Sequence, residues 1–426
     1  MLPINQFYYL SKLFGLAPFP LDGNIASDGA RFSAHRELLP ACIAMLLYTS
    51  TLVSILWNSG IDSTISNTAN WIQFIPNSYA YLFAIVFAIR KRAVISDILY
   101  TFDLYDERLH SQFGISHTDI KRKVKWVSLM ACLVTLTSGG AVSGLNFMIG
   151  VNWDRIWTLF YWMAFCIPKF GLLLYTFQFA GSIMLLSNRT VLLQIGIDNY
   201  LNETNQQQLR KSSLSHSLCS QEPPSYGKHI HTVSIKVKPF YTISDTVDNI
   251  YQMVEHLQQL AVKINDSFGK QAVFSLLSAF ICITVQLYYL LNQIRAGFVI
   301  PGAAVFCLAA SSLLLLHGIE FYALFTNGDL ARNHWRQLMN YLFVVKAKSS
   351  DENFRAKMDE LIGFMSCNSP EFRAFGLFPI DLSVLTGMAS SIATYLIVLV
   401  QFKMSEEDGQ PFGTAEITRH YNPMIG

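Results

Sequence analysis

The stretch SVLTGMASSIATYLIVLVQF, residues 383–402, decides which fold is expected of this chain. It runs for 20 residues without a charged side chain, about the length that a helix needs to cross the hydrocarbon core of a bilayer. One set of its polar residues recurs at separations of 3, 4, 4 and 7, namely Ser383, Thr386, Ser390, Thr394 and Gln401. These separations are multiples of the helical period, so the segment is expected to be a transmembrane helix with one narrow polar edge.

Two interpretations of this polar edge are open, because in lipid it must face either protein or water. Small polar residues at helical spacing commonly let membrane helices pack closely. The alternative is a water-filled path, which is favoured by the large amide of Gln401 beside Phe402 at the end of the segment. A ring of such side chains could close a pore by dewetting. A single helix encloses no pore, so the second interpretation requires a symmetric oligomer.

The composition of the whole chain also indicates a membrane protein. Of its 426 residues, 52% are hydrophobic and only 14% are charged, against roughly 25% charged residues in an average soluble domain. The net charge of +2 gives no reason to expect nucleic acid as a partner. The seven cysteines form no CxxC pair, so neither a disulfide framework nor a metal site is expected. The chain lacks the common catalytic motifs, so we expect neither an enzyme nor a cofactor.

Seven apolar runs of about the spanning length predict an all-α membrane protein with seven transmembrane helices. The runs are 40–58, 71–89, 126–149, 157–186, 272–294, 301–326 and 380–402. The fourth run contains Lys169, and the sixth contains His317 and Glu320. The first residues of the chain have no basic region ahead of an apolar core, so a signal peptide is not expected.

The distribution of Lys and Arg predicts how the chain is oriented in the plasma membrane. The N-terminal segment and the three long loops on its side contain 26 of these residues, and the opposite loops and the tail contain 4. Basic residues are retained on the cytoplasmic side. We therefore expect a cytosolic N-terminus and an extracellular C-terminus, the inverse of a G-protein-coupled receptor.

The two ends of the chain resemble a known family. Thr394-Tyr395, five apolar residues and then Gln401-Phe402 resemble the Thr-Tyr-x5-Gln-Phe signature that closes the seventh helix of insect gustatory receptors. The segment GLFPIDLS (376–383) resembles the start of that helix, and FYYLSKLFGLAPF (7–19) resembles a common N-terminal segment of the family. The middle of the chain is similar to the family by topology.

This resemblance implies a tetrameric, ligand-gated, non-selective cation channel in a sensory neuron, either a homotetramer or a heteromer with related subunits. A small tastant, such as a sugar or a bitter compound, would open it to cations. The seventh helix would line the pore, with Thr386, Ser390 and Thr394 along it and with Gln401 and Phe402 as gate residues. Thr394 and Tyr395 belong to the signature and are expected to act in packing or coupling.

With that resemblance, the chain divides into seven expected parts. They are a cytosolic N-terminal segment (1–39), transmembrane helices one to four (40–186), a cytosolic loop (187–271), transmembrane helices five and six (272–326), cytosolic anchor helices (327–379), the pore-lining helix (380–402) and an extracellular tail (403–426). Within 187–271, a Ser- and Gln-rich stretch at about 203–239 is expected to be disordered. The apolar spacing after it predicts an amphipathic helix that runs into the fifth span.

The ligand is expected between the outer halves of the first six helices. Aromatic and polar residues near the ends of the spans are candidates for contact, namely Trp157, Tyr161, Asp154, Tyr79, Gln286 and Tyr289. Residues of this kind are more often interfacial or core residues than ligand contacts, and Trp157 and Tyr161 are the favoured candidates. Lys169 needs a partner inside the bundle, and by depth Glu320 is the nearest candidate for a buried ion pair, either structural or ligand-binding.

Two other functions stay open at this point. A metabotropic seven-helix receptor would have its N-terminus outside and would depend on G proteins. A transporter would show saturable uptake and often internal repeats, which are not visible in this sequence.

Overall fold

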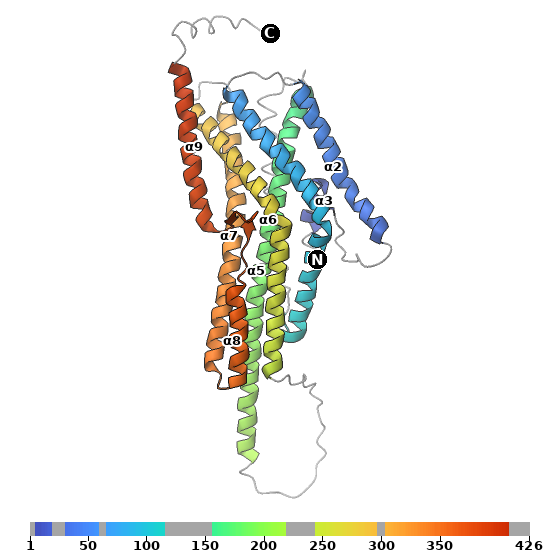
Figure 1. Cartoon of the computed structure of the whole chain (residues 1–426), viewed down its shortest axis with the longest axis vertical. Coiled ribbons are helices and arrows are strands. Elements are labelled where there is room, and N and C mark those ends of the chain that lie inside the picture. Colours follow the sequence, from blue (N-terminus) through green and yellow to red (C-terminus); the bar gives the residue numbers. More distant parts are fainter. Residues whose placement is uncertain are drawn as a thin grey trace, which may run out of the picture.

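The computed structural model describes residues 5–18, 30–58, 65–115, 156–218, 243–295 and 303–408. Within these ranges the chain is almost wholly helical, and the long helices run along the longest axis of the molecule (Figure 1). The elements are α1 (Asn5–Leu13), α2 (Ala30–Asn58), α3 (Ile65–Phe113), α5 (Ile156–Leu218), α6 (Ile243–Arg295), α7 (Ala303–Lys348), α8 (Glu352–Cys367), β1 (Arg373–Ala374), β2 (Phe378–Pro379) and α9 (Leu382–Asp408).

Five of the described helices contain an apolar stretch long enough to cross a membrane, namely α3, α5, α6, α7 and α9. A shorter apolar stretch, Leu38–Val53, lies in α2. Six of the seven predicted runs coincide with these six helices, and the third run, 126–149, lies outside the described residues. The all-α membrane fold is therefore confirmed. The count of seven spans and the side on which each terminus lies stay predictions.

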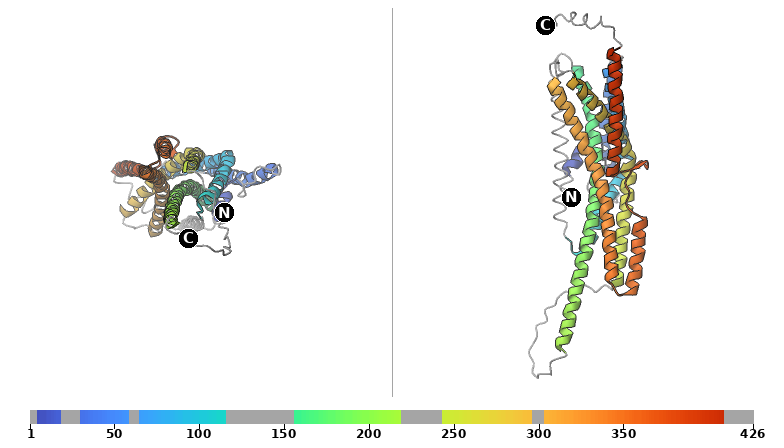
Figure 2. Two further views of the ribbon diagram at one scale, coloured as in Figure 1. Left: turned by 90° about the horizontal axis from the view of Figure 1, so that it is seen from below. Right: turned by 90° about the vertical axis from the view of Figure 1, so that its left-hand side faces the viewer.

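Four helices are far longer than a membrane is thick. The helices α3, α5, α6 and α7 contain 49, 63, 53 and 46 residues, which at 1.5 Å per residue corresponds to about 75, 95, 80 and 70 Å. The hydrocarbon core measures roughly 30 Å. Their lower halves therefore continue beyond the apolar spans, and α8 packs beside them there (Figures 1 and 2). The stretch predicted as an amphipathic helix forms the first part of α6, where Val247, Ile250, Val254 and Leu257 are buried.

Two boundaries differ from the sequence-based expectation. The helix α5 continues to Leu218, so the first part of the stretch expected to be disordered is helical, and residues 219–239 lie outside the described residues. That first part, ETNQQQLRKSS, is poor in apolar residues but rich in good helix formers, which explains the error. The helix α9 runs past Phe402 to Asp408, so the first residues of the expected tail extend the last helix.

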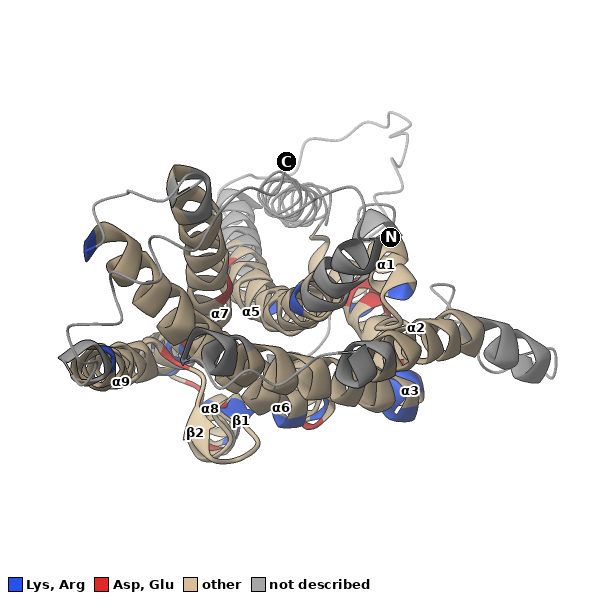
Figure 3. Cartoon of the chain, turned by 90° about the horizontal axis from the view of Figure 1, so that it is seen from above, with Lys and Arg blue, Asp and Glu red and all other residues tan. Residues whose placement is uncertain are grey.

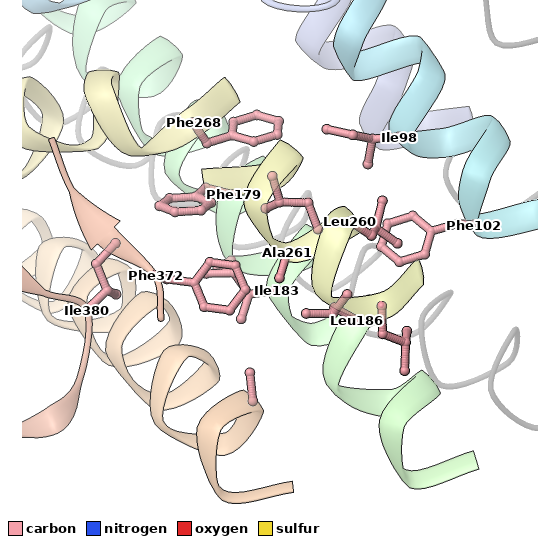
Figure 4. Close-up of a cluster of buried hydrophobic side chains, with 14 of the residues drawn as sticks. Ile98, Phe102, Phe179, Ile183, Leu186, Leu260, Ala261, Phe268, Phe372 and Ile380 are labelled. Carbon is pink, nitrogen blue, oxygen red and sulfur yellow. The ribbon is translucent and has the colours of Figure 1, made fainter. Parts of the chain in front are cut away.

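The core of the lower half joins α3, α5 and α6 to the segment before α9 (Figure 4). Phe179 on α5 and Phe268 on α6 are stacked with ring centroids 5.6 Å apart. Phe372, just before β1, meets Phe179 edge to face at 6.2 Å. The chain that leads into α9 is thus anchored in the main hydrophobic core.

The helix α8 is amphipathic and covers the lower part of α6 and α7. Asp351 caps its N-terminus by accepting hydrogen bonds from the backbone N–H groups of Asn353 and Phe354. On the facing helix, the buried Trp335 donates its indole N–H to the carbonyl oxygen of Met365 at 3.0 Å. The bond from Trp335 thus holds α8 against α7.

A polar contact links α5 and α7 in the same lower region. The hydroxyl oxygen of Ser187 lies 2.6 Å from Nδ1 of the half-buried His334. Burial lowers the pKa of His334, and the contact with Ser187 raises it by less. The imidazole is therefore neutral near pH 7.

Candidate functional site

The last helix, α9, differs from every other long apolar helix that the structure describes. Half or more of the apolar stretch is buried in α3, α5, α6 and α7, and none of it is buried in α9. The helix stands at one edge of the bundle, beside α6 and α7 (Figure 3). Among the described residues, the chain covers α9 on one side only, which leaves its other sides to lipid or to another chain.

The side of α9 that rests on the bundle is apolar. At the foot of the helix, Val384, Leu385 and Met388 pack against the hydrophobic core. Farther along, Ile392 and Leu396 are half-buried. With 100° of rotation per residue, these residues share one face. Tyr395 lies at the border of this face and meets Phe280 of α6 edge to face, with ring centroids 6.0 Å apart.

The predicted polar edge lies on the opposite side of α9. All of its members are exposed, namely Ser383, Thr386, Ser390, Thr394 and Gln401. Their mean direction is about 180° away from the packed face. The hydroxyl group of Thr394 donates to the carbonyl oxygen of Ser390 at 3.0 Å, so it makes a hydrogen bond within the helix and can face either water or an apolar surface. The polar edge therefore makes no packing contact with α6 or α7.

Gln401 and Phe402 do not share one direction on α9. The side chain of Phe402 is 64% exposed, and it points about 100° away from that of Gln401. Because α9 continues to Asp408, both residues precede the helix end by more than a turn. Of the two predicted gate residues, only Gln401 lies on the polar edge.

A second group of polar side chains is buried between α3 and α6, among the apolar spans. Asn77 of α3 donates to the sulfur atom of Cys282 at 3.0 Å and accepts a hydrogen bond from Ser278. Gln73 lies four residues before Asn77 on α3, and Gln286 lies four residues after Cys282 on α6. The side chains of these two glutamines contact each other at 3.5 Å. All five side chains are buried.

This group continues to α5 and α7. The carboxylate of Glu320 is 2% exposed. It accepts a hydrogen bond from the hydroxyl group of Thr176 at 2.7 Å and lies 3.0 Å from Nδ1 of His317. Cys282 is near enough to His317 and Lys169 to interact electrostatically with both, so the two sets of buried polar residues adjoin at Cys282.

We call the residues described in the last two paragraphs the buried polar cluster. Lys169 and Glu320 both belong to it, but the described contacts of Glu320 are with Thr176 and His317 and not with Lys169. The direct ion pair expected from similar depth is thus not among the described contacts of Glu320. Depth along a helix does not indicate the direction in which a side chain points.

The predicted ligand residues differ in burial and in their distance from the buried polar cluster. Gln286 is part of the buried polar cluster, and Tyr289 is half-buried beside Tyr288, at 5.6 Å between ring centroids. Tyr79 is 69% exposed, on the face of α3 away from the cluster. Trp157 and Tyr161 lie in α5 but their side chains are not among those described, and Asp154 lies outside the described residues.

Sequence reasoning missed Ser278 and Cys282 as members of the cluster. A signal for them was present, because Gln73 and Asn77 are four residues apart, as are Ser278, Cys282 and Gln286. That spacing puts each set on one face of its helix. In the part of the chain that the structure describes, no three His, Cys, Asp or Glu side chains come together in a way that could hold a metal ion.

Comparison with known proteins agrees with this architecture. Residues 5–406 match the family model described as 7tm Chemosensory receptor. Over 159 residues the chain is 30% identical to gustatory and pheromone receptor 32a of Drosophila melanogaster. The aligned region covers 37% of this chain and 33% of that receptor. The chain thus spans about a third of the length of this curated relative.

The fold is similar to that of a solved insect receptor. The olfactory receptor OR5 from Machilis hrabei superposes with a TM-score of 0.64, covering 94% of this chain and 97% of that chain at 10% sequence identity. The structure of the same receptor in complex with eugenol gives a TM-score of 0.57 with the same coverage. At 10% identity these two likenesses concern the fold.

Proposed function

Because the chain belongs to the 7tm chemosensory receptor family, we propose that it is a taste receptor that acts as a ligand-gated, non-selective cation channel. The family confirms the resemblance inferred from both ends of the sequence. It also confirms that the chain is a receptor and not an enzyme, and that it is a multi-pass membrane protein. The proposal adds the gustatory role, the ion-conducting activity and the assembly into a tetramer of identical or related subunits.

One observation carries this proposal: the polar edge of α9 lies opposite the face that packs on α6 and α7. The hydroxyl group of Thr394 is satisfied within the helix, but the larger amide of Gln401 is costly to place in lipid, so the edge favours water or another chain next to it. Copies arranged around a shared axis would bring several such edges together and enclose a polar path. The packing interpretation of the edge would require a helix against it, and α6 and α7 lie on the other side.

In this proposal Gln401 is the main gate residue, because it is the largest polar side chain on the edge and lies toward the end of α9. Phe402 flanks it on the neighbouring helix face. Thr386, Ser390 and Thr394 line the path below, and Tyr395 holds α9 against Phe280. The cytosolic anchor domain would consist of the lower halves of α5, α6 and α7 together with α8.

A small tastant would bind above the buried polar cluster, between the outer halves of the helices. The buried amide of Gln286 and the half-buried Tyr289 support this position. Trp157, Tyr161 and Asp154 remain candidates from the sequence. Tyr79 is no longer favoured, because its side chain points away from the cluster.

The test is a current recording from cells that express this chain alone or with related subunits. A panel of sugars and bitter compounds is applied, with G-protein signalling intact and then blocked. We expect a ligand-evoked cation current that persists under the block, and we expect Gln401→Ala to change its permeation or gating. A response that disappears under the block would favour a metabotropic receptor, and Gln401→Ala without effect would remove Gln401 from the pore.

A further inference from the structure

The segment between α8 and α9, residues 368–381, is here called the connector. It contains a minimal antiparallel hairpin in which Arg373 pairs with Pro379 and Ala374 with Phe378. At its tip, Phe375 and Gly376 both have positive φ values, 51° and 73°. The connector is the only covalent link between the cytosolic end of the bundle and α9, so its contacts determine where α9 begins.

The connector is held on α6 at a glycine. The backbone N–H of Phe375 donates to the carbonyl oxygen of Gly269 at 2.8 Å. One turn earlier, the side-chain oxygen of Asn265 accepts a hydrogen bond from the N–H of Arg373 at 2.8 Å. A Cβ atom on Gly269 would lie 2.6 Å from the carbonyl oxygen of Arg373, too near for any other residue at this position.

A second glycine receives the connector on α7. A Cβ atom on Gly328 would overlap the carbonyl oxygen of Ile380, which is backbone and cannot rotate away. One turn farther along α7, Arg332 forms an ion pair with Asp381 at 3.0 Å. The other carboxylate oxygen of Asp381 accepts the backbone N–H of Ser383 at 3.1 Å and thus caps the start of α9.

The same helix carries part of the buried polar cluster. From Ala303 to Lys348, α7 is one unbroken helix. Glu320 precedes Gly328 by eight residues, which is about 12 Å along the axis. A shift of α7 that begins at Glu320 therefore reaches Gly328 and Arg332 as a rigid displacement, and the close backbone contact at Gly328 passes it to Ile380 and Asp381.

We propose that Gly328 and Arg332 are positioning residues that couple α7 to the start of α9, so that the state of the buried polar cluster sets the position of the pore helix. This inference rests on the proposed channel function. Coupling of this kind requires two arrangements of α7. The ligand must bind more tightly to the arrangement that goes with the open position of α9. Couplings between sites in proteins typically change an equilibrium by about 5- to 150-fold.

The first experiment compares two identical substitutions on one helix. Gly328→Ala places a Cβ atom against the backbone of Ile380, whereas Gly318→Ala meets nothing within 4 Å. For each variant the ratio of ligand-evoked to ligand-free current is measured and divided by the amount of protein at the cell surface. We expect Gly328→Ala to lower this ratio by about five-fold or more and Gly318→Ala to leave it unchanged. Equal ratios for the two variants would overturn the inference.

A second set of variants covers the case in which Gly328→Ala does not reach the surface. Arg332→Gln and Asp381→Asn each remove one charge of the ion pair, and Asp381→Asn keeps an oxygen atom that can accept the N–H of Ser383. We expect each single variant to lower the current ratio and the double variant to add little, because both remove the same interaction. Additive effects would mean that the two residues act separately and would contradict the coupling.

A third measurement separates this inference from the channel proposal. Thermal unfolding of the purified full chain in detergent requires no ion conduction. If Gly328→Ala lowers the melting temperature relative to Gly318→Ala while even the unmodified chain conducts no current, alone or with related subunits, the connector contact is supported and the channel proposal fails. If the unmodified chain conducts and the two variants match in both measurements, the connector inference fails and the channel proposal stands.

Discussion

Thr176 and Thr190 are the same type of residue on the same helix, and both are buried, but their hydroxyl groups differ in what they contact. That of Thr176 donates to Glu320 of α7 at 2.7 Å. That of Thr190 donates to the carbonyl oxygen of Leu186 in its own helix at 3.3 Å. The comparison isolates one hydrogen bond between helices.

We predict that Thr176→Val costs about 1–3 kcal/mol of stability, the usual cost of removing a hydrogen bond to a buried charged group. Thr190→Val removes only a bond within the helix, and its effect should be much smaller. Thermal unfolding of the purified variants in mild detergent measures both. Equal shifts in melting temperature would show that the bond to Glu320 does not stabilise the fold.

For single residues, the sequence predicted which side chains are buried better than it predicted which side chains they contact. It identified Lys169 and Glu320 as charges inside the bundle, and both are buried. It did not identify His317 and Thr176 as the partners of Glu320, because a partner on another helix depends on how that helix is rotated. The same holds for Tyr79, which is two residues from Asn77 and therefore points to a different side of α3, away from the buried polar cluster.

Among the elements, α9 offers a matched test of its orientation. Ser390 lies on the polar edge, and Ser391 is rotated from it by about 100°. Both are exposed in the described chain. We predict that a thiol-reactive reagent applied from outside inhibits the current of Ser390→Cys and has little effect on Ser391→Cys. The unmodified chain, which has its own exposed cysteines Cys42 and Cys367, serves as the background control.

The reverse result would place Ser391 on the ion path and rotate α9 from the orientation proposed here. Block of both variants to the same extent would mean that the helix faces water on more than one side.

The polar edge of α9 could be predicted from the sequence because helical periodicity alone determines it. The connector could not be predicted. Its strands contain two residues each, too few for a period of two to be recognised. The positive φ of Phe375 is unusual for a bulky residue, and the close approach at Gly328 depends on the rotation of α7. From the sequence, the last part of the connector, within GLFPIDLS, was identified only as the start of the last helix.

For the whole molecule, the long helices α5, α6 and α7 explain why the connections on one side of the predicted membrane contain so many residues. They continue as helices through much of the segments that the sequence identified as loops 187–271 and 327–379. The 26 to 4 distribution of basic residues predicts that this side faces the cytosol.

This orientation leads to a prediction for intact cells. An epitope appended after Gly426 should bind antibody from outside without permeabilisation, and an epitope placed before Met1 should bind only after permeabilisation. The physical reason is that helix ends rich in Lys and Arg are retained in the cytosol. Binding at the N-terminal epitope in intact cells would reverse the topology and remove the basis for an outward-facing gate at Gln401.

The exposure of α9 also has a consequence for synthesis of the protein. This helix is the last of the described helices to leave the ribosome, and no described residue beyond Asp381 is buried. A premature stop codon just after that residue would therefore remove no fully buried side chain of the described chain, and it would uncover only the part of the core on which Val384, Leu385 and Met388 pack. Such a shortened product would keep its folded body and escape the degradation that removes misfolded chains, while it lacks the helix that we assign to conduction. If it joined complete subunits, one defective allele would silence the products of the intact one.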